Sequence, residues 1–281
     1  MNLTGQVALI TGAGSADGIG FACAKSLAAD GAHVVIASTT DRINDRVAEL
    51  ESMGCSATGF VGDLMVDGVA ASLVDTTLAV AGRVDICVNN AGMIALGISP
   101  RSRTMAEVSA DDWADSLHRN LTTCFTVTQA CLPPMRDRGY GRIVNVASTS
   151  GPVQAFLGDP GYHAAKAGMI GLTRAIALEV AGAGITVNAV SPGWIATGAQ
   201  LMGEHNACSF TPLGRSGTPD GRFHADPFGH AEVHQHGPRL RDHDVGRLDV
   251  TVDDADAVRG GQGARDLPRI SEGLGRLDGS A

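Results

Sequence analysis

Residues 7–20 of the chain read VALITGAGSADGIG. The first four residues are all apolar, as in a short strand buried on both faces of a sheet. A glycine-rich loop follows at once, and a stretch with helical spacing begins after it. Glycines at such a turn let the backbone approach a phosphate closely, and the next helix N-terminus offers free N–H groups. The spacing is not G-x-G-x-x-G, so an ordinary glycine-rich loop is the alternative interpretation.

The alternation that begins there continues to about residue 195. Runs rich in β-branched residues lie at 7–11, 33–37, 57–61, 85–89, 142–147 and 186–190, and helical spacing occurs at 20–30, 44–53, 69–81, 112–135 and 161–181. Strands that alternate with helices indicate a parallel sheet covered on both faces, with right-handed connections. We predict an α/β fold with a doubly wound, Rossmann-like parallel sheet in a single domain over residues 1–220.

Composition excludes several kinds of partner. The chain has 281 residues, 44% of them hydrophobic, and a formal net charge of −9, which disfavours nucleic acid and anionic membranes. No apolar run approaches the ~20 residues of a membrane span, and the N-terminus does not read as a signal peptide. The six cysteines are scattered without a C-x-x-C pair, which indicates reduced thiols. We expect a cytoplasmic protein that binds neither nucleic acid nor membrane.

The amino-acid composition of the chain changes after Asp220. About a third of the remaining residues are charged, five are histidines, and hydrophobic periodicity fades. We expect residues 221–281 to form a poorly ordered, atypical C-terminal tail. His230, His234 and His236 have a spacing that can bind a metal, but without a stable scaffold we interpret them as incidental and expect no metal site.

Four polar residues point to acid–base chemistry. Tyr162 and Lys166 lie four residues apart on one predicted helix and therefore share a face. A tyrosine, with a free pKa near 10, becomes an effective acid/base when a neighbouring ammonium stabilises its phenolate. Ser148 follows a predicted strand, at the sheet edge where α/β proteins bind ligands, and can polarise a carbonyl oxygen. Asn120 lies inside a predicted helix, where asparagine is normally a surface residue. We interpret His163, next to Tyr162, as a helix-surface residue.

Taken in order, these motifs resemble the short-chain dehydrogenase/reductase family over roughly residues 3–220. The resemblance rests on Thr11-Gly12 followed by Gly18-Ile19-Gly20, on Asn89-Asn90-Ala91-Gly92, on Pro192-Gly193 and Thr197, and on the four polar residues above. The family loop has three residues between Gly12 and Gly18, whereas this chain has five. Within the family, the chain is similar to 3-oxoacyl-carrier-protein reductases and alcohol dehydrogenases.

The resemblance implies hydride transfer between a nicotinamide cofactor and a small-molecule ketone or secondary alcohol. Ser148 would polarise the carbonyl, Tyr162 would transfer the proton, Lys166 would tune Tyr162 and bind ribose, and Asn120 would support a proton relay. The segment at 198–212 would form a substrate lid. The implied cofactor contacts are Gly12, Ser15, Gly18, Ile19, Gly20, Ser38, Thr39, Asp63, Leu64, Asn90, Ala91, Gly92, Tyr162, Lys166, Pro192, Gly193, Ile195 and Thr197.

The end of the second predicted strand bears on the choice of cofactor. A carboxylate there hydrogen-bonds a ribose 2′-hydroxyl and repels a 2′-phosphate. This chain has Ser38 at that position, with Arg42 nearby, so we favour NADP(H). NAD(H) stays open because Asp41 adjoins Arg42.

The tail leaves a second function open. Beyond Asp220 the chain does not match the helix and last strand that the resemblance implies, and the abrupt change indicates a shifted reading frame. The alternative is therefore a cofactor-binding protein with impaired or no turnover. We expect a homodimer or homotetramer if the C-terminal sheet edge is intact.

Overall fold

The computed structural model describes residues 2–92, 104–198 and 215–220. Its centre is one six-stranded sheet in the order β3-β2-β1-β4-β5-β6, in which every neighbouring pair is parallel. The strands are β1 (Val7–Ile10), β2 (His33–Ser38), β3 (Ala57–Val61), β4 (Ile86–Asn89), β5 (Gly141–Val146) and β6 (Ile185–Val190). The prediction of a doubly wound, Rossmann-like parallel sheet is confirmed.

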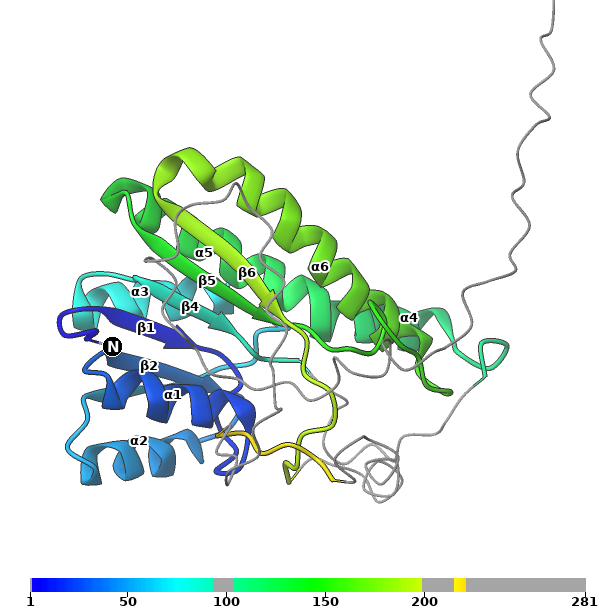
Figure 1. Ribbon diagram of the computed structural model, residues 1–281, viewed down its shortest axis with the longest axis horizontal. Coiled ribbons are helices and arrows are strands. Elements are labelled where there is room, and N and C mark those ends of the chain that lie inside the picture. Colours follow the sequence, from blue (N-terminus) through cyan, green and yellow to red (C-terminus); the bar gives the residue numbers. More distant parts are fainter. Residues whose placement is uncertain (1, 93–103, 199–214, 221–281) are drawn as a thin grey trace, which may run out of the picture.

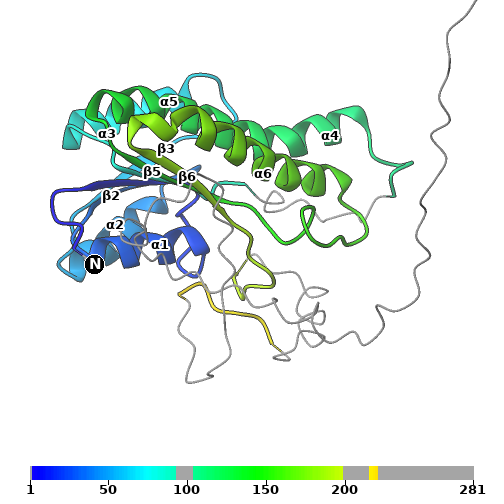
Figure 2. The ribbon, with the colours of Figure 1, turned by 45° about the horizontal axis from the view of Figure 1, so that its top comes forward.

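Helices cover both faces of this sheet (Figures 1 and 2). One face carries α1 (Ile19–Ala29) and α2 (Ile43–Ser52). The opposite face carries α3 (Val69–Ala81), α4 (Ala110–Leu117), α5 (Thr123–Arg138) and α6 (Pro160–Val180), and a 3-10 turn, Ala181–Ala183, follows α6.

The apolar run of β1 explains why the sheet holds two helical layers. Ala8 and Ile10 pack with the α1 and α2 layer, whereas Val7 and Leu9 pack with α3, α5 and α6. Successive strand residues point to opposite faces, so a strand covered on both sides needs apolar residues throughout. The sheet therefore separates two hydrophobic cores.

The strand order reverses between β1 and β4. From β1 the chain proceeds outward through β2 and β3, and it then returns to continue from β4 in the other direction. A crevice opens at the carboxyl ends of the strands where such a reversal occurs, and α/β proteins bind ligands there.

The long helix predicted at 112–135 is interrupted. A π-helical turn, His118–Thr122, joins α4 to α5. Two side chains bind backbone carbonyls four residues earlier: Asn120 Nδ2 donates to Ser116 O at 3.1 Å, and Thr123 Oγ1 donates to Arg119 O at 2.8 Å. Single π-turns of this kind are common at functional sites.

Several expectations concern residues other than those described. Both the tail at 221–281 and nearly all of the lid at 198–212 lie outside the described residues. Among the residues that the structure does describe, no helix is long and apolar enough to cross a membrane, and no group of His, Cys, Asp and Glu can hold a metal ion.

Candidate active site

A cleft of about 500 Å³ lies at the carboxyl ends of the six strands. It brings together all but two of the predicted site residues, the exceptions being Gly20 and Asn120. The predicted residues that line it are Gly12, Ser15, Gly18, Ile19, Ser38, Thr39, Asp63, Leu64, Asn90, Ala91, Gly92, Ser148, Tyr162, Lys166, Pro192, Gly193, Ile195 and Thr197.

The glycine loop after β1 is packed too closely to accept side chains. Asn90 Nδ2 donates to Thr11 O at 3.1 Å and to Gly12 O at 3.0 Å, which ties this loop to the one after β4. A Cβ atom added to Gly20 would lie 2.5 Å from Asn90 Nδ2 and 2.7 Å from Gly12 O. Gly20 therefore serves the cleft indirectly, because it lets α1 begin against the loop.

The two extra residues of the loop fold back on themselves. Ser15 Oγ donates to Asp17 Oδ1 at 2.6 Å, and this bond lowers the pKa of Asp17. The Asp17 carboxylate also lies against Gly198, where an added Cβ atom would be 2.7 Å from Asp17 Oδ2. The longer loop therefore contacts the segment that follows β6.

A cation and a hydroxyl lie where β2 ends. Ser38 Oγ donates to Thr40 O at 2.7 Å, and Arg42 lines the cleft beside Ser38. A Cβ atom on Gly14 would lie 2.8 Å from Arg42 Nε and 2.9 Å from Ser38 Oγ. Asp41 is exposed and is not one of the lining residues. This corner can accept an anionic group.

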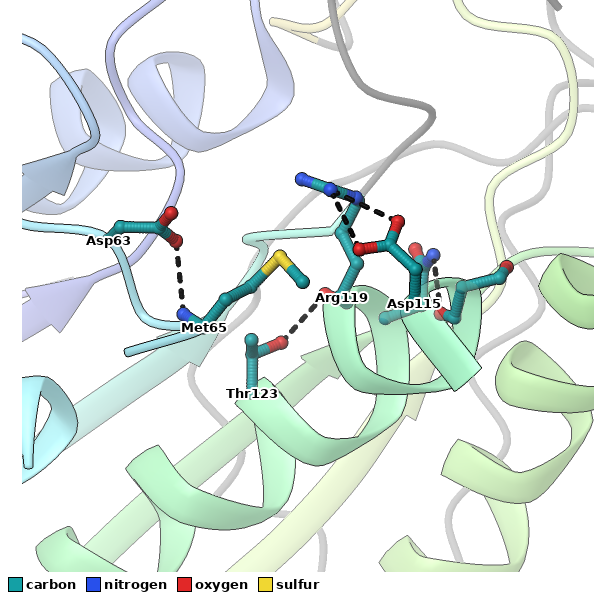
Figure 3. A network of polar contacts seen from close by, with 7 residues as sticks. Asp63, Met65, Asp115, Arg119 and Thr123 are labelled. Atoms are coloured by element: carbon teal, nitrogen blue, oxygen red, sulfur yellow. Dashed lines mark hydrogen bonds and ion pairs between the residues drawn. The ribbon is translucent and has the colours of Figure 1, made fainter. Parts of the chain in front are cut away.

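Further along the cleft, two walls face each other (Figure 3). On one wall Met65 N donates to Asp63 Oδ1 at 3.0 Å. On the other, the guanidinium of Arg119 forms an ion pair with Asp115 at 3.1 Å. Sequence reasoning did not single out Met65 or Arg119. The available signal for Arg119 was its place directly before Asn120.

Lys166 provides the buried charge of the site. It is 3% exposed, its Nζ donates to Val146 O at 2.9 Å, and it lies 5.7 Å from the centroid of the Tyr162 ring. Burial lowers the pKa of Lys166 to about 8. The amine is therefore still mostly protonated at neutral pH, and a cation this near can stabilise a phenolate. Ser148 Oγ, which lines the same cleft, accepts from Ser150 N at 3.1 Å.

Asn120 lies behind the cleft wall. It is 2% exposed, and its Oδ1 has no hydrogen-bond partner among the described residues. A Cβ atom on Gly92, which has a φ of 127°, would lie 2.9 Å from this oxygen. The π-helical turn and Gly92 together leave a buried acceptor behind the cleft wall.

A buried polar network supports this end of the cleft. Asn89 Nδ2 donates to Asn145 Oδ1 at 2.9 Å and to Thr128 Oγ1 at 2.8 Å, and Asn145 Nδ2 donates to Thr173 Oγ1 at 2.9 Å. These bonds join β4, β5, α5 and α6. Satisfied networks of this kind rigidify a core, so they hold fixed the strand whose Val146 carbonyl accepts from Lys166.

His163 is not the helix-surface residue that we expected. It is half-buried, and both of its ring nitrogens have backbone partners. Phe156 N donates to Nε2 at 3.0 Å, and Nδ1 lies 2.6 Å from Asp159 O. Sequence reasoning missed this role because both partners belong to a loop with no regular pattern.

Comparisons with known proteins agree with this geometry. Residues 6–205 match the model of the short chain dehydrogenase family. A 3-oxoacyl-(acyl-carrier-protein) reductase from Synechocystis is 38% identical over 224 residues, covering 78% of this chain and 86% of that protein. The (2S)-((R)-hydroxy(phenyl)methyl)succinyl-CoA dehydrogenase subunit BbsD of Thauera aromatica is 38% identical over 228 residues, covering 78% and 87%.

A solved structure from the same family is also similar to this chain. The crystal structure of a short-chain dehydrogenase/reductase from Burkholderia xenovorans superposes with a TM-score of 0.70 at 35% identity, covering 78% of this chain and 86% of that one. The chain belongs to the short-chain dehydrogenase/reductase family of NAD(P)-dependent oxidoreductases.

Proposed function

We propose that the protein transfers a hydride between NADP(H) and a ketone or secondary alcohol, with NAD(H) as the weaker cofactor. The observation that carries the proposal is one continuous cleft with two different ends. Glycines and a helix N-terminus line one end, and Ser148, Tyr162 and the buried Lys166 line the other. A dinucleotide needs the first kind of surface, and carbonyl chemistry needs the second.

The residues present fit a nicotinamide dinucleotide. The backbone around Gly12 and Gly18 is packed closely, since added Cβ atoms would lie 2.8 Å from Ala91 Cα and 3.1 Å from Ser15 Cβ, and this side-chain-free loop with its helix N-terminus would cradle the pyrophosphate. Asp63 would hold the adenosine, and Ile195 and Thr197 would hold the nicotinamide carboxamide. Leu64, Asn90, Ala91, Gly92, Pro192 and Gly193 would complete the walls around these groups. The bound cofactor supplies the hydride.

The protein side chains then handle the proton. Tyr162 would donate a proton to the carbonyl oxygen in reduction and accept it in oxidation, while Ser148 would donate a hydrogen bond to the same oxygen. Lys166 would lower the pKa of Tyr162 by its charge and bind the ribose hydroxyls. Asn120 Oδ1 would accept from a water that links Lys166 to solvent, which gives the buried oxygen a partner.

The relatives narrow the substrate class. The two proteins named above are described as a 3-oxoacyl-(acyl-carrier-protein) reductase and as a dehydrogenase of a hydroxyacyl-CoA thioester. We therefore propose 3-oxoacyl thioesters, and simple 3-oxo esters that mimic them, as substrates of this chain.

A preference for NADP(H) is supported by the corner at the end of β2. Arg42 and Ser38 line the cleft there, whereas the exposed Asp41 does not. Replacement of Ser38 with Asp should repel a 2′-phosphate and bind a 2′-hydroxyl. We expect S38D to shift the ratio of kcat/KM values for NADPH and NADH about tenfold toward NADH, or about 1.4 kcal/mol. A wild-type protein that already prefers NADH tenfold would contradict the assignment.

The test of the function is a paired assay of NADPH and NADH consumption with ethyl acetoacetate and acetoacetyl-CoA. We expect reduction of both substrates, faster with NADPH. Fluorescence titration with the same cofactors distinguishes the alternative, a protein that binds dinucleotide without turnover. Tight binding with no consumption on either substrate would favour that alternative.

A further inference from the structure

Residues 149–157 form a compact segment between Ser148 and Tyr162. Gly151 N donates to Gln154 O at 2.7 Å, and Gln154 Nε2 donates to Thr149 Oγ1 at 2.8 Å. Gln154 and Phe156 line the cleft together with Ser148 and Tyr162. This segment therefore forms a wall of the space next to the reacting groups.

Both halves of the segment lie against His163 of α6. In the first half, Gly151 has a φ of 99°, and a Cβ atom there would collide with the backbone oxygen of His163. In the second half, Phe156 N donates to His163 Nε2 at 3.0 Å. The first half thus packs closely on the backbone of His163, and the second half is bonded to its ring.

The partners of His163 define its tautomer. Asp159 O, which lies 2.6 Å from Nδ1, is a carbonyl and can only accept, so Nδ1 carries the proton. Nε2 accepts from Phe156 N and so carries the lone pair. Only a neutral imidazole with its proton on Nδ1 makes both bonds.

The bond from Phe156 N to His163 places the Phe156 ring near Tyr162. Its centroid lies 4.3 Å from that of His163 and 6.3 Å from that of Tyr162. The ring is 37% exposed and lines the cleft, so an apolar surface remains free for a ligand beside Tyr162.

We propose that neutral His163 is a positioning residue that fixes Phe156 as an apolar wall for the substituent of the carbonyl substrate. The wall selects ketones that carry an aryl or similarly bulky apolar group next to the reacting carbon. This inference rests on the function proposed above, because it assigns a specificity to the same site. His163 contacts the wall and not the reacting atoms.

Three substitutions separate the two bonds of His163. Leu removes both bonds. Asn keeps a donor near the position of Nδ1 and so preserves only the bond to Asp159, whereas Gln reaches the position of Nε2 with an oxygen that can accept from Phe156 N. The proposal therefore predicts that H163Q resembles the wild type and that H163N resembles H163L. L157A is the control for the segment, because the Leu157 side chain is 93% exposed.

The first measurement is reduction of ethyl benzoylacetate, an aryl ketone, against ethyl acetoacetate, its methyl counterpart. We expect the KM for the aryl ester to rise about tenfold in H163L, H163N and F156A, as for loss of a well-placed aromatic contact. The kcat for both esters and the KM for the methyl ester should change by less than about threefold. H163L combined with F156A should add little to either, because both remove the same wall. Equal losses for the two esters, or an H163Q protein that behaves like H163N, would overturn the proposal.

The second measurement does not depend on turnover. Amide hydrogen exchange of a peptide that spans residues 150–158 reports the bond from Phe156 N, and we expect about tenfold faster exchange at this amide in H163N than in the wild type or H163Q. Unchanged exchange in H163N overturns the positioning role even if both esters are reduced. The expected exchange pattern in a protein that reduces neither ester contradicts the proposed function instead.

Discussion

The two ends of the cleft are built in opposite ways. At the end near the β1 loop the cleft is built mainly from backbone, and the absence of side chains on the glycines is what matters. Cβ atoms on Gly12, Gly14 or Gly20 would all lie within 3.0 Å of neighbouring atoms. At the other end Ser148, Tyr162 and Lys166 line the cleft, Lys166 is 3% exposed, and Asn120, at 2% exposure, lies buried behind the wall.

This difference predicts how each end responds to substitution. The glycine end supplies a closely packed backbone without side chains, so substitutions there should alter cofactor affinity and leave the rate of the chemical step unchanged. Buried polar groups are what the other end supplies, and their burial itself is unfavourable. Changes there should alter turnover, and some should make the protein more stable.

The largest effect should come from Tyr162. We expect Y162F to reduce kcat by about 10²–10⁴-fold, because it removes the proton-transfer group and keeps the ring that packs near Phe156. Cofactor affinity, measured by fluorescence titration, should change by less than about threefold. Tyr140 gives a matched control, since it lies apart from the cleft with its hydroxyl 3.4 Å from Gln6 Oε1. An activity of Y162F above a tenth of the wild type, with Y140F unaffected, would contradict the mechanism.

Next in size should be a substitution at the glycine end. We expect G20A to raise the Kd for NADPH about 10- to 100-fold, because the new Cβ atom would lie 2.5 Å from Asn90 Nδ2 and 2.7 Å from Gly12 O and would push the loop away. At saturating cofactor, kcat should stay within about threefold. Gly171 is the control: it also lies in a helix, nothing lies within 4 Å of an added Cβ atom, and G171A should bind NADPH normally. A normal affinity of G20A for NADPH would contradict the explanation of this end of the cleft by steric crowding.

Much of the fold could be predicted because short runs rich in β-branched and apolar residues alternate along the chain with stretches of helical spacing. The helix predicted at 69–81 is α3, Val69–Ala81, and the strand predicted at 57–61 is β3, Ala57–Val61. The π-helical turn at His118–Thr122 could not be predicted in this way. It accompanies side-chain bonds to preceding carbonyls, such as that from Asn120 Nδ2 to Ser116 O, and these bonds leave no signal in the spacing of apolar residues.

The residues of the site also differ in whether their roles could be predicted from the sequence. Tyr162 and Lys166 could be paired from sequence because a four-residue spacing fixes their relation on one helix. A buried asparagine such as Asn145 could not be placed in this way, since its partners lie on other elements of the fold. Asn145, for example, bonds Asn89 and Thr173, which lie 56 and 28 residues away along the chain.

The smallest effect should appear in stability and concerns Lys166, whose ordinary pKa of 10.5 is lowered by burial to about 8. The charged amine is disfavoured in the folded state, so below pH 8 the folded protein carries an unfavourable charge. Between pH 8 and 10.5 the unfolded chain binds more protons than the folded one, and wild-type stability therefore rises with pH in this window, by at most roughly 3 kcal/mol from this group.

Replacement of Lys166 with Met removes this dependence and keeps the length of the side chain. We expect K166M to be more stable than the wild type by about 1–2 kcal/mol at pH 7, once roughly 1 kcal/mol is deducted for the lost hydrogen bond to Val146 O. The advantage should shrink above pH 8 and be lost before pH 10.5, because the wild type gains up to roughly 3 kcal/mol across this window, which is more than the initial difference. Urea unfolding at each pH measures the difference, with K25M, at a half-buried position beside the Phe21 ring and away from the cleft, as the control. The opposite result is a stability difference between K166M and the wild type that is less favourable to K166M at pH 7 than at pH 10. It would show that the charged lysine stabilises the fold, and it would contradict the proposed difference between the two ends of the cleft.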